Sequence, residues 1–175
     1  MAKLIHIFVG GESFADKTIK KYSHAGNDDI VHVAGIIFGR TLEALATKDE
    51  GDLYPGTWLH RKDKYFNNPN ARFIMVDVPD LAAGMDVASG LLGTPYGYSD
   101  CLKTAIFEET GTQLPDSDAT TMCAEDWVRI DRGAGLPVLP DIEPGNISPV
   151  RFYRALINDH GGIDVTHLFR NKGVA

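Results

Sequence analysis

The sequence predicts an α+β fold in which an antiparallel sheet packs against helices. Strand-like segments, which are short apolar runs rich in β-branched residues, gather in the first half of the chain. Segments with helical spacing and helix-capping residues follow in the second half. With 175 residues, 43% of them hydrophobic and 23% charged, the chain is expected to form a single domain over residues 1–175.

The clearest strand in the first half is predicted over Ile30–Phe38, where nearly every residue is apolar and Gly39 ends the run. Thr41–Ala46 follows after a short turn and is expected to pair with it as a hairpin. The other elements expected here are strands over Leu4–Val9 and Phe73–Val78, a short helix over Phe14–Tyr22, and a polar, irregular stretch over Lys48–Asn70.

Helices are predicted in the second half because apolar residues recur at helical spacing between capping and terminating residues. Thr120 or Thr121 is expected to cap the helix that carries Cys123, and Pro149 suits the first turn of the last helix. The predicted helices cover Leu81–Leu92, residues 99–110, a segment that begins after Thr120 or Thr121, and Pro149–Asn158, with loops over Leu114–Thr120 and Gly133–Ser148.

Charge and composition exclude several partner classes. The formal net charge of −7, without a basic cluster, argues against nucleic acid and against an anionic membrane surface. No apolar run approaches the roughly 20 residues of a membrane span, and the N-terminal run is too short for a signal peptide. We therefore expect no stable membrane insertion and, by default, a cytoplasmic location, with non-classical export left open. No metal-binding C-x-x-C or H-E-x-x-H spacing occurs, and no cofactor is expected.

The two cysteines, Cys101 and Cys123, are too few for a disulfide framework and are expected to be free thiols. Each lies near a predicted helix start, where unpaired N–H groups and the helix dipole favour a thiolate. Acidic residues flank both, so local sequence does not separate a nucleophile from a small buried core residue.

Among the six histidines, His32 is distinctive because it interrupts an apolar strand. A half-buried imidazole needs a partner for each ring nitrogen, so His32 is either a satisfied core residue or a general base. Glu43 lies on the strand predicted to pair with it and would approach His32 across the hairpin, unless it is an exposed edge carboxylate. His6, on the first strand, is interpreted as structural.

Four short segments occur in a characteristic order. They are His32-Val33-Ala34-Gly35-Ile36, Glu43-Ala44, Gly93-Thr94-Pro95-Tyr96 and Cys123-Ala124-Glu125, followed by Ile147-Ser148-Pro149-Val150-Arg151-Phe152. In this order the chain resembles the permuted papain-like amidases of the NlpC/P60 superfamily (the YaeF/YiiX-like group). The histidine precedes the cysteine, which is typical of a circularly permuted fold. The chain departs from that group at Ala124, where serine is usual, and at Gly97, where an acidic residue is common.

The resemblance implies that Cys123 is the nucleophile, His32 the base, Glu43 the orienting acid and Tyr96 a substrate-binding residue. It also implies a cysteine hydrolase that cleaves an amide bond in a peptidoglycan-type peptide or an N-acyl substrate. Two alternatives remain: acyl transfer by the same Cys/His pair, and an inactive binding domain of this fold. A second interpretation takes Cys101 as the nucleophile of an unpermuted NlpC/P60 domain, with His160 or His167 as its base.

Overall fold

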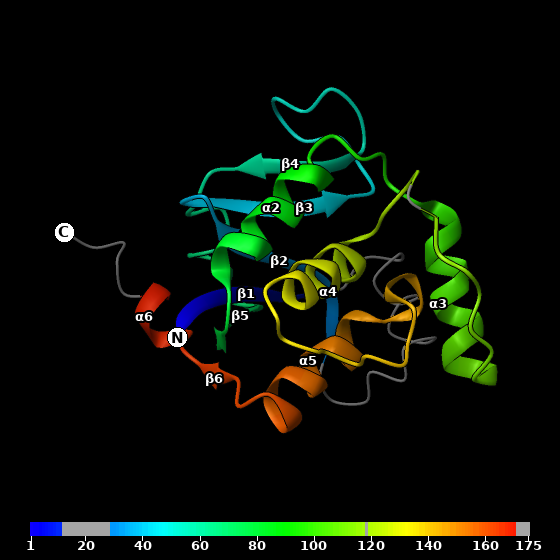
Figure 1. The fold of residues 1–175 in the computed structure, drawn as a ribbon. Coiled ribbons are helices and arrows are strands. Elements are labelled where there is room, and N and C mark those ends of the chain that lie inside the picture. The colour runs from blue at the N-terminus through cyan, green and yellow to red at the C-terminus, as the bar shows by residue number, and fades with distance from the viewer. Residues whose placement is uncertain (12–28, 118, 171–175) are drawn as a thin grey trace.

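The computed structural model describes residues 1–11, 29–117 and 119–170, and within these ranges the predicted α+β class, with an antiparallel sheet and helices, is confirmed (Figure 1). Six strands form one sheet in the order β4-β3-β2-β1-β5-β6. The strands are β1 (Ala2–Gly10), β2 (Ile30–Ile37), β3 (Arg40–Leu45), β4 (Gly56–His60), β5 (Ala71–Val78) and β6 (Ile163–Asp164).

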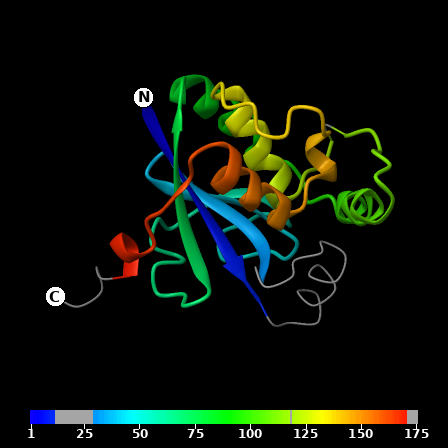
Figure 2. The same ribbon diagram turned by 90° about the horizontal axis from the view of Figure 1, so that it is seen from below.

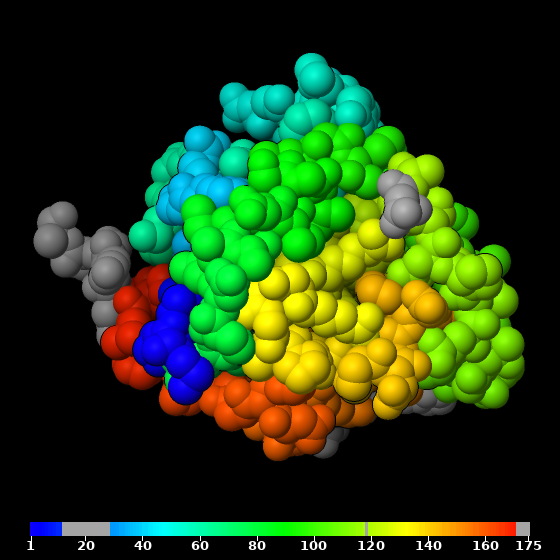
Figure 3. Space-filling view, in the orientation of Figure 1, coloured from blue at the N-terminus to red at the C-terminus, as the bar shows by residue number. Residues whose placement is uncertain are grey.

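The helices lie mainly on one side of this sheet. Figures 1 and 2 show α2, α4 and α5 against that face and α3 at one end of the molecule, and the space-filling view shows the helices closing over the middle of the sheet (Figure 3). No helix of the described part of the chain has both the length and the apolar character of a membrane span. The helices are α2 (Leu81–Leu91), α3 (Tyr98–Thr110), α4 (Cys123–Gly133), the short 3-10 helix η1 (Pro144–Asn146), α5 (Pro149–Asp159) and α6 (His167–Arg170).

Two hydrophobic clusters cover the two faces of the sheet. The larger one packs β1, β2 and β5 against α2, α4 and α5, with Trp127 of α4 fully buried at its centre. A Cβ at Gly35 of β2 would lie 2.5 Å from the Trp127 ring, so glycine is required for α4 to approach the sheet this closely. The smaller cluster, on the opposite face, includes Phe73 and is covered by Phe66 and Phe169.

The predicted threonine cap of α4 is wrong. Met122 is the N-cap residue, and no side chain caps this helix. The two threonine hydroxyls are engaged by buried carboxylates instead: Thr120 donates to Asp100 (3.0 Å) and Thr121 donates to Asp126 (2.6 Å). Cys123 therefore occupies the first helical position of α4, at the positive end of its dipole.

The expectation of an irregular stretch over Lys48–Asn70 is wrong at β4. This five-residue strand pairs with β3 and forms one edge of the sheet. The chain after α5 adds the short strand β6 and the short helix α6. The predicted helix over Phe14–Tyr22 lies outside the described residues.

Candidate functional site

The hairpin of β2 and β3 brings His32 and Glu43 together. Ala34 and Glu43 are directly opposite one another in the antiparallel register, so His32 is the diagonal neighbour of Glu43 on the same face. The Glu43 Oε2 atom lies 2.8 Å from Nε2 of His32. The carboxylate is fully buried, whereas the His32 side chain is 19% exposed. Glu43 is thus a buried partner of the imidazole and not an exposed edge carboxylate.

The Cys123 side chain, at the start of α4, interacts with the same imidazole and raises its pKa. Burial alone would lower the pKa of His32, but hydrogen bonds with the side chains of Cys123 and Glu43, together with their charges, raise it to about 10. Because Nε2 contacts Glu43, Nδ1 is the ring nitrogen available to the Cys123 thiol. The His32 imidazole therefore interacts with both a thiol and a carboxylate.

Glu43 is the centre of a larger polar network. Its Oε2 also accepts a hydrogen bond from the Tyr65 hydroxyl (2.5 Å), and its Oε1 lies 2.9 Å from His60 Nδ1 and 2.6 Å from Lys64 Nζ. These two Oε1 contacts are ion pairs whose angles fall outside hydrogen-bond geometry. Burial would raise the pKa of Glu43, but contacts with His32 and His60 and the charge of Lys64 hold it well below its usual range. Glu43 is therefore an anion.

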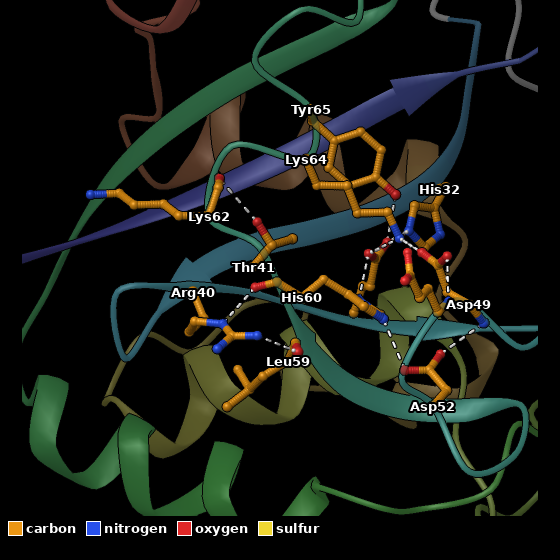
Figure 4. A network of polar contacts seen from close by, with 12 residues as sticks. His32, Arg40, Thr41, Asp49, Asp52, Leu59, His60, Lys62, Lys64 and Tyr65 are labelled. Atoms are coloured by element: carbon orange, nitrogen blue, oxygen red, sulfur yellow. Dashed lines mark hydrogen bonds and ion pairs between the residues drawn. The ribbon is translucent and has the colours of Figure 1, made fainter.

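A second layer of carboxylates holds the cations that contact Glu43 (Figure 4). Nε2 of His60 lies 3.0 Å from Asp52 Oδ1, and Lys64 Nζ lies 2.6 Å from Asp49 Oδ2. The two acids are themselves linked, because the backbone N–H of Asp49 donates to Asp52 Oδ2 (3.0 Å). Figure 4 shows these side chains converging from β4 and from the loops on either side of it.

Sequence reasoning did not identify His60, Lys64 or Tyr65. All three belong to the stretch interpreted as irregular. The missing signal was strand β4: its register places Trp58 opposite Glu43, so His60, two residues further, is a diagonal neighbour of Glu43.

Tyr96 lies beside the start of α4. The segment around it pairs with Thr121: Thr121 N–H donates to the Pro95 carbonyl (3.0 Å) and Gly97 N–H donates to the Thr121 carbonyl (2.7 Å). Burial raises the pKa of Tyr96 well above its usual value, and the charges of Cys123 and Cys101 raise it further. Its hydroxyl therefore stays protonated and can donate a hydrogen bond near the thiol.

Cys101, in α3, differs from Cys123 in its surroundings. Its Sγ lies 3.5 Å from the Tyr96 hydroxyl. Burial raises the pKa of Cys101, and the charges of Cys123 and Asp100 add to this effect, against a hydrogen bond from Tyr96 that lowers it. A raised pKa keeps this sulfur a thiol, which is the less nucleophilic form.

The histidines of the alternative interpretation lie elsewhere. His160 is the C-cap residue of α5, and His167 begins α6, which Figures 1 and 2 show at the end of the molecule opposite α3. Cys101 on α3 is thus far from His167, whereas Cys123 is adjacent to His32.

The start of α4 also offers hydrogen-bond donors. The first hydrogen bond within the helix runs from Asp126 N–H to the Met122 carbonyl (3.1 Å). The N–H groups of Cys123, Ala124 and Glu125 precede it and have no helical carbonyl to bind. Together with the dipole they can stabilise negative charge on an oxygen beside the Cys123 sulfur. Thiol, imidazole, carboxylate and N–H donors are the groups required for nucleophilic attack on a carbonyl.

No group of three or more His, Cys, Asp or Glu side chains in the described ranges is arranged to hold a metal ion. Neither a known protein-family model nor any of the curated proteins compared with the chain matches it.

Proposed function

We propose that this protein is a cysteine hydrolase with a circularly permuted papain-like (NlpC/P60-like) fold, which cleaves an amide bond through an acyl-cysteine intermediate. The observation that carries the proposal is the continuous set of contacts from Cys123, at the first position of α4, through His32 to the buried anion of Glu43. A purely structural histidine–carboxylate pair does not need the interaction that His32 also makes with a thiol at a helix start.

Before the substrate binds, transfer of the Cys123 thiol proton to Nδ1 of His32 gives a thiolate–imidazolium pair, which the raised pKa of His32 favours. The thiolate attacks the carbonyl carbon of the amide, and the N–H groups at the start of α4 stabilise the oxyanion. His32 then gives its proton to the leaving amine as the C–N bond breaks, which leaves an acyl-cysteine. Glu43 holds the ring orientation and stabilises the imidazolium throughout.

In the second half, His32 takes a proton from water, and the hydroxide attacks the acyl-cysteine. The S–C bond breaks, the carboxylic acid leaves, and the proton returns to the thiolate. The raised pKa of His32, about 10, favours an imidazolium at neutral pH and therefore a proton that is available to the leaving amine.

The substrate class follows from the resemblance to the permuted amidases: a peptide of the peptidoglycan type or an N-acyl amide. Tyr96 is the residue that we assign to substrate binding, because its protonated hydroxyl lies near the thiol and can donate to an amide carbonyl.

The reactivity of Cys123 tests the proposal. In a Cys101→Ser background we expect iodoacetamide to alkylate Cys123 at pH 6 about 30-fold faster than free cysteine, whose thiol is almost fully protonated at this pH. p-Nitrophenyl acetate should give a burst of nitrophenol and an acetyl adduct on Cys123, both absent after Cys123→Ser, as read by absorbance and intact mass.

Two results would argue against hydrolysis. A Cys123 that alkylates at the rate of free cysteine would contradict catalysis and favour the inactive binding domain. An acetyl adduct that is stable in water but transferred to an added amine such as glycinamide would favour the acyltransferase.

A further inference from the structure

His60 lies across Glu43 from His32. Its two ring nitrogens both face carboxylate oxygens, Nδ1 at 2.9 Å from Glu43 and Nε2 at 3.0 Å from Asp52. A neutral imidazole carries one N–H, so only the imidazolium places a proton toward both carboxylates. His60 is also largely buried, with 8% of its side chain exposed, which limits the screening of its charge by water. Carboxylate oxygens beside both ring nitrogens therefore favour the cationic form of His60 on this side of Glu43.

We propose that His60, held as an imidazolium by Asp52, is a positioning residue that fixes the Glu43 carboxylate and shares its negative charge with His32. The inference rests on the proposed function and adds a role for a residue outside the Cys123–His32–Glu43 set. Each oxygen of the Glu43 carboxylate contacts a different histidine. Oε2 contacts His32, and Oε1 contacts His60 together with Lys64.

The sign of the effect on His32 follows from the charges around Glu43. His32 approaches it from β2, His60 from β4, and Lys64 and Tyr65 from the loop after β4. Asp52 and Asp49 face His60 and Lys64, and the thiol of Cys123 faces His32 from α4.

A cation beside Oε1 partly neutralises the Glu43 charge, so Glu43 stabilises the His32 imidazolium less and raises its pKa less. His60 thus makes His32 a stronger acid than a histidine paired with Glu43 alone, which suits proton donation to a leaving amine.

His60 and Lys64 also line a polar cavity of about 610 Å³. Neither Cys123, His32 nor Tyr96 lines it, and exposed side chains such as Arg61 form part of its wall. His60 can therefore exchange its proton with solvent while the Cys123 side of the site is occupied. The other charged residues of this wall are Arg40, Asp49, Glu50 and Asp63.

The test measures the pKa of His32 by NMR titration of its ring carbons in the Cys101→Ser protein. His60→Gln keeps an amide donor but removes the charge, and we expect it to raise the pKa of His32 by about one unit. Lys64→Met removes the second cation at the same oxygen and should shift the pKa in the same direction. It also provides the measurement if His60→Gln does not fold.

Arg61→Met is the matched control. It removes a cation from the same cavity wall, but Arg61 pairs with Asp63 (2.8 Å) and is largely exposed, so the pKa of His32 should stay within 0.2 units or so. If wild-type Cys123 shows fast alkylation at pH 6 while His60→Gln and Lys64→Met leave the pKa of His32 unchanged, the role of His60 is overturned and the hydrolase stands. Slow alkylation of the wild type would count against the hydrolase instead.

Discussion

His6 and His32 each lie against a carboxylate at almost the same distance, and the two pairs differ in what surrounds the imidazole. His6 and Asp131 lie 3.0 Å apart with both side chains fully buried, and His32 and Glu43 lie 2.8 Å apart. The His6 ring packs edge-on against Trp127, with ring centroids 5.1 Å apart, and its Nδ1 has no hydrogen-bond partner among the described residues. The His32 ring is partly exposed, and its second nitrogen is available to a thiol.

A contact with a carboxylate alone therefore does not define the candidate site. Both pairs involve helix α4: Asp131 binds His6 near its end, and Cys123 meets His32 at its beginning. We infer that the first pair holds α4 on β1, whereas the second pair, in the proposed function, takes part in proton transfer to and from Cys123. Only substitutions in the second pair should therefore change the acylation rate per folded molecule.

Removal of the His32 imidazole should give the largest effect. We expect His32→Ala to slow the acylation of Cys123 by p-nitrophenyl acetate at least about 10³-fold, because the general base is lost. The rate is measured per folded molecule, because loss of the imidazole also removes a partner of the buried Glu43 carboxylate and lowers stability. A variant that keeps more than a tenth of the wild-type rate would show that His32 is not the base.

Removal of the His6 imidazole should act on stability instead. His6→Ala leaves Asp131 buried without its partner and opens a cavity beside Trp127, so we expect the free energy of unfolding to fall by about 3 kcal/mol. The acylation rate per folded molecule should be unchanged at 15 °C. Denaturant unfolding and active-site titration measure the two quantities, and a large loss of rate in fully folded protein would contradict this division of roles.

The pH dependence of stability offers a smaller effect. Because the pKa of His32 is raised from 6.5 to about 10, its stabilisation is complete below pH 6.5 and is lost as the pH rises through about 10. Relative to His32→Gln, the wild type should lose about 1 kcal/mol of unfolding free energy between pH 8.5 and 9.5, above the ordinary pKa of an unfolded thiol. Urea unfolding at these pH values checks this, and parallel curves for the two proteins would contradict it.

The parts of the fold that were predictable have strong local patterns. The strand that contains His32 is a long apolar run, and its hairpin with β3 sets the register that brings Glu43 to the histidine. The helix with Cys123 was predicted, but its N-cap residue was not, because the hydroxyls of Thr120 and Thr121 donate to the carboxylates of Asp100 and Asp126 and not to backbone groups at the helix start.

The second half of the network was not predictable for a physical reason. Strand β4 has five residues, forms an edge of the sheet and lies within a polar stretch, so it shows no alternation long enough to recognise. Because this strand was not predicted, the sequence did not indicate that His60 lies beside Glu43. Lys64 and Tyr65 reach Glu43 from the loop after it, where only tertiary structure determines which side chains meet.

Glycine at position 35 sets the distance between α4 and the sheet, and therefore the position of the Cys123 thiol at the candidate site. Gly35 is three residues after His32 on β2, and the Trp127 ring that it accommodates is one turn after Cys123 on α4. A single extra carbon at position 35 would press on the ring and also meet the Ile5 carbonyl oxygen at 2.7 Å. Helix α4 would have to move away from the sheet as a rigid body, and the Cys123 thiol would move away from the His32 imidazole. A random screen for lost activity should therefore recover Gly35→Ala, at a position that takes no part in any proton transfer.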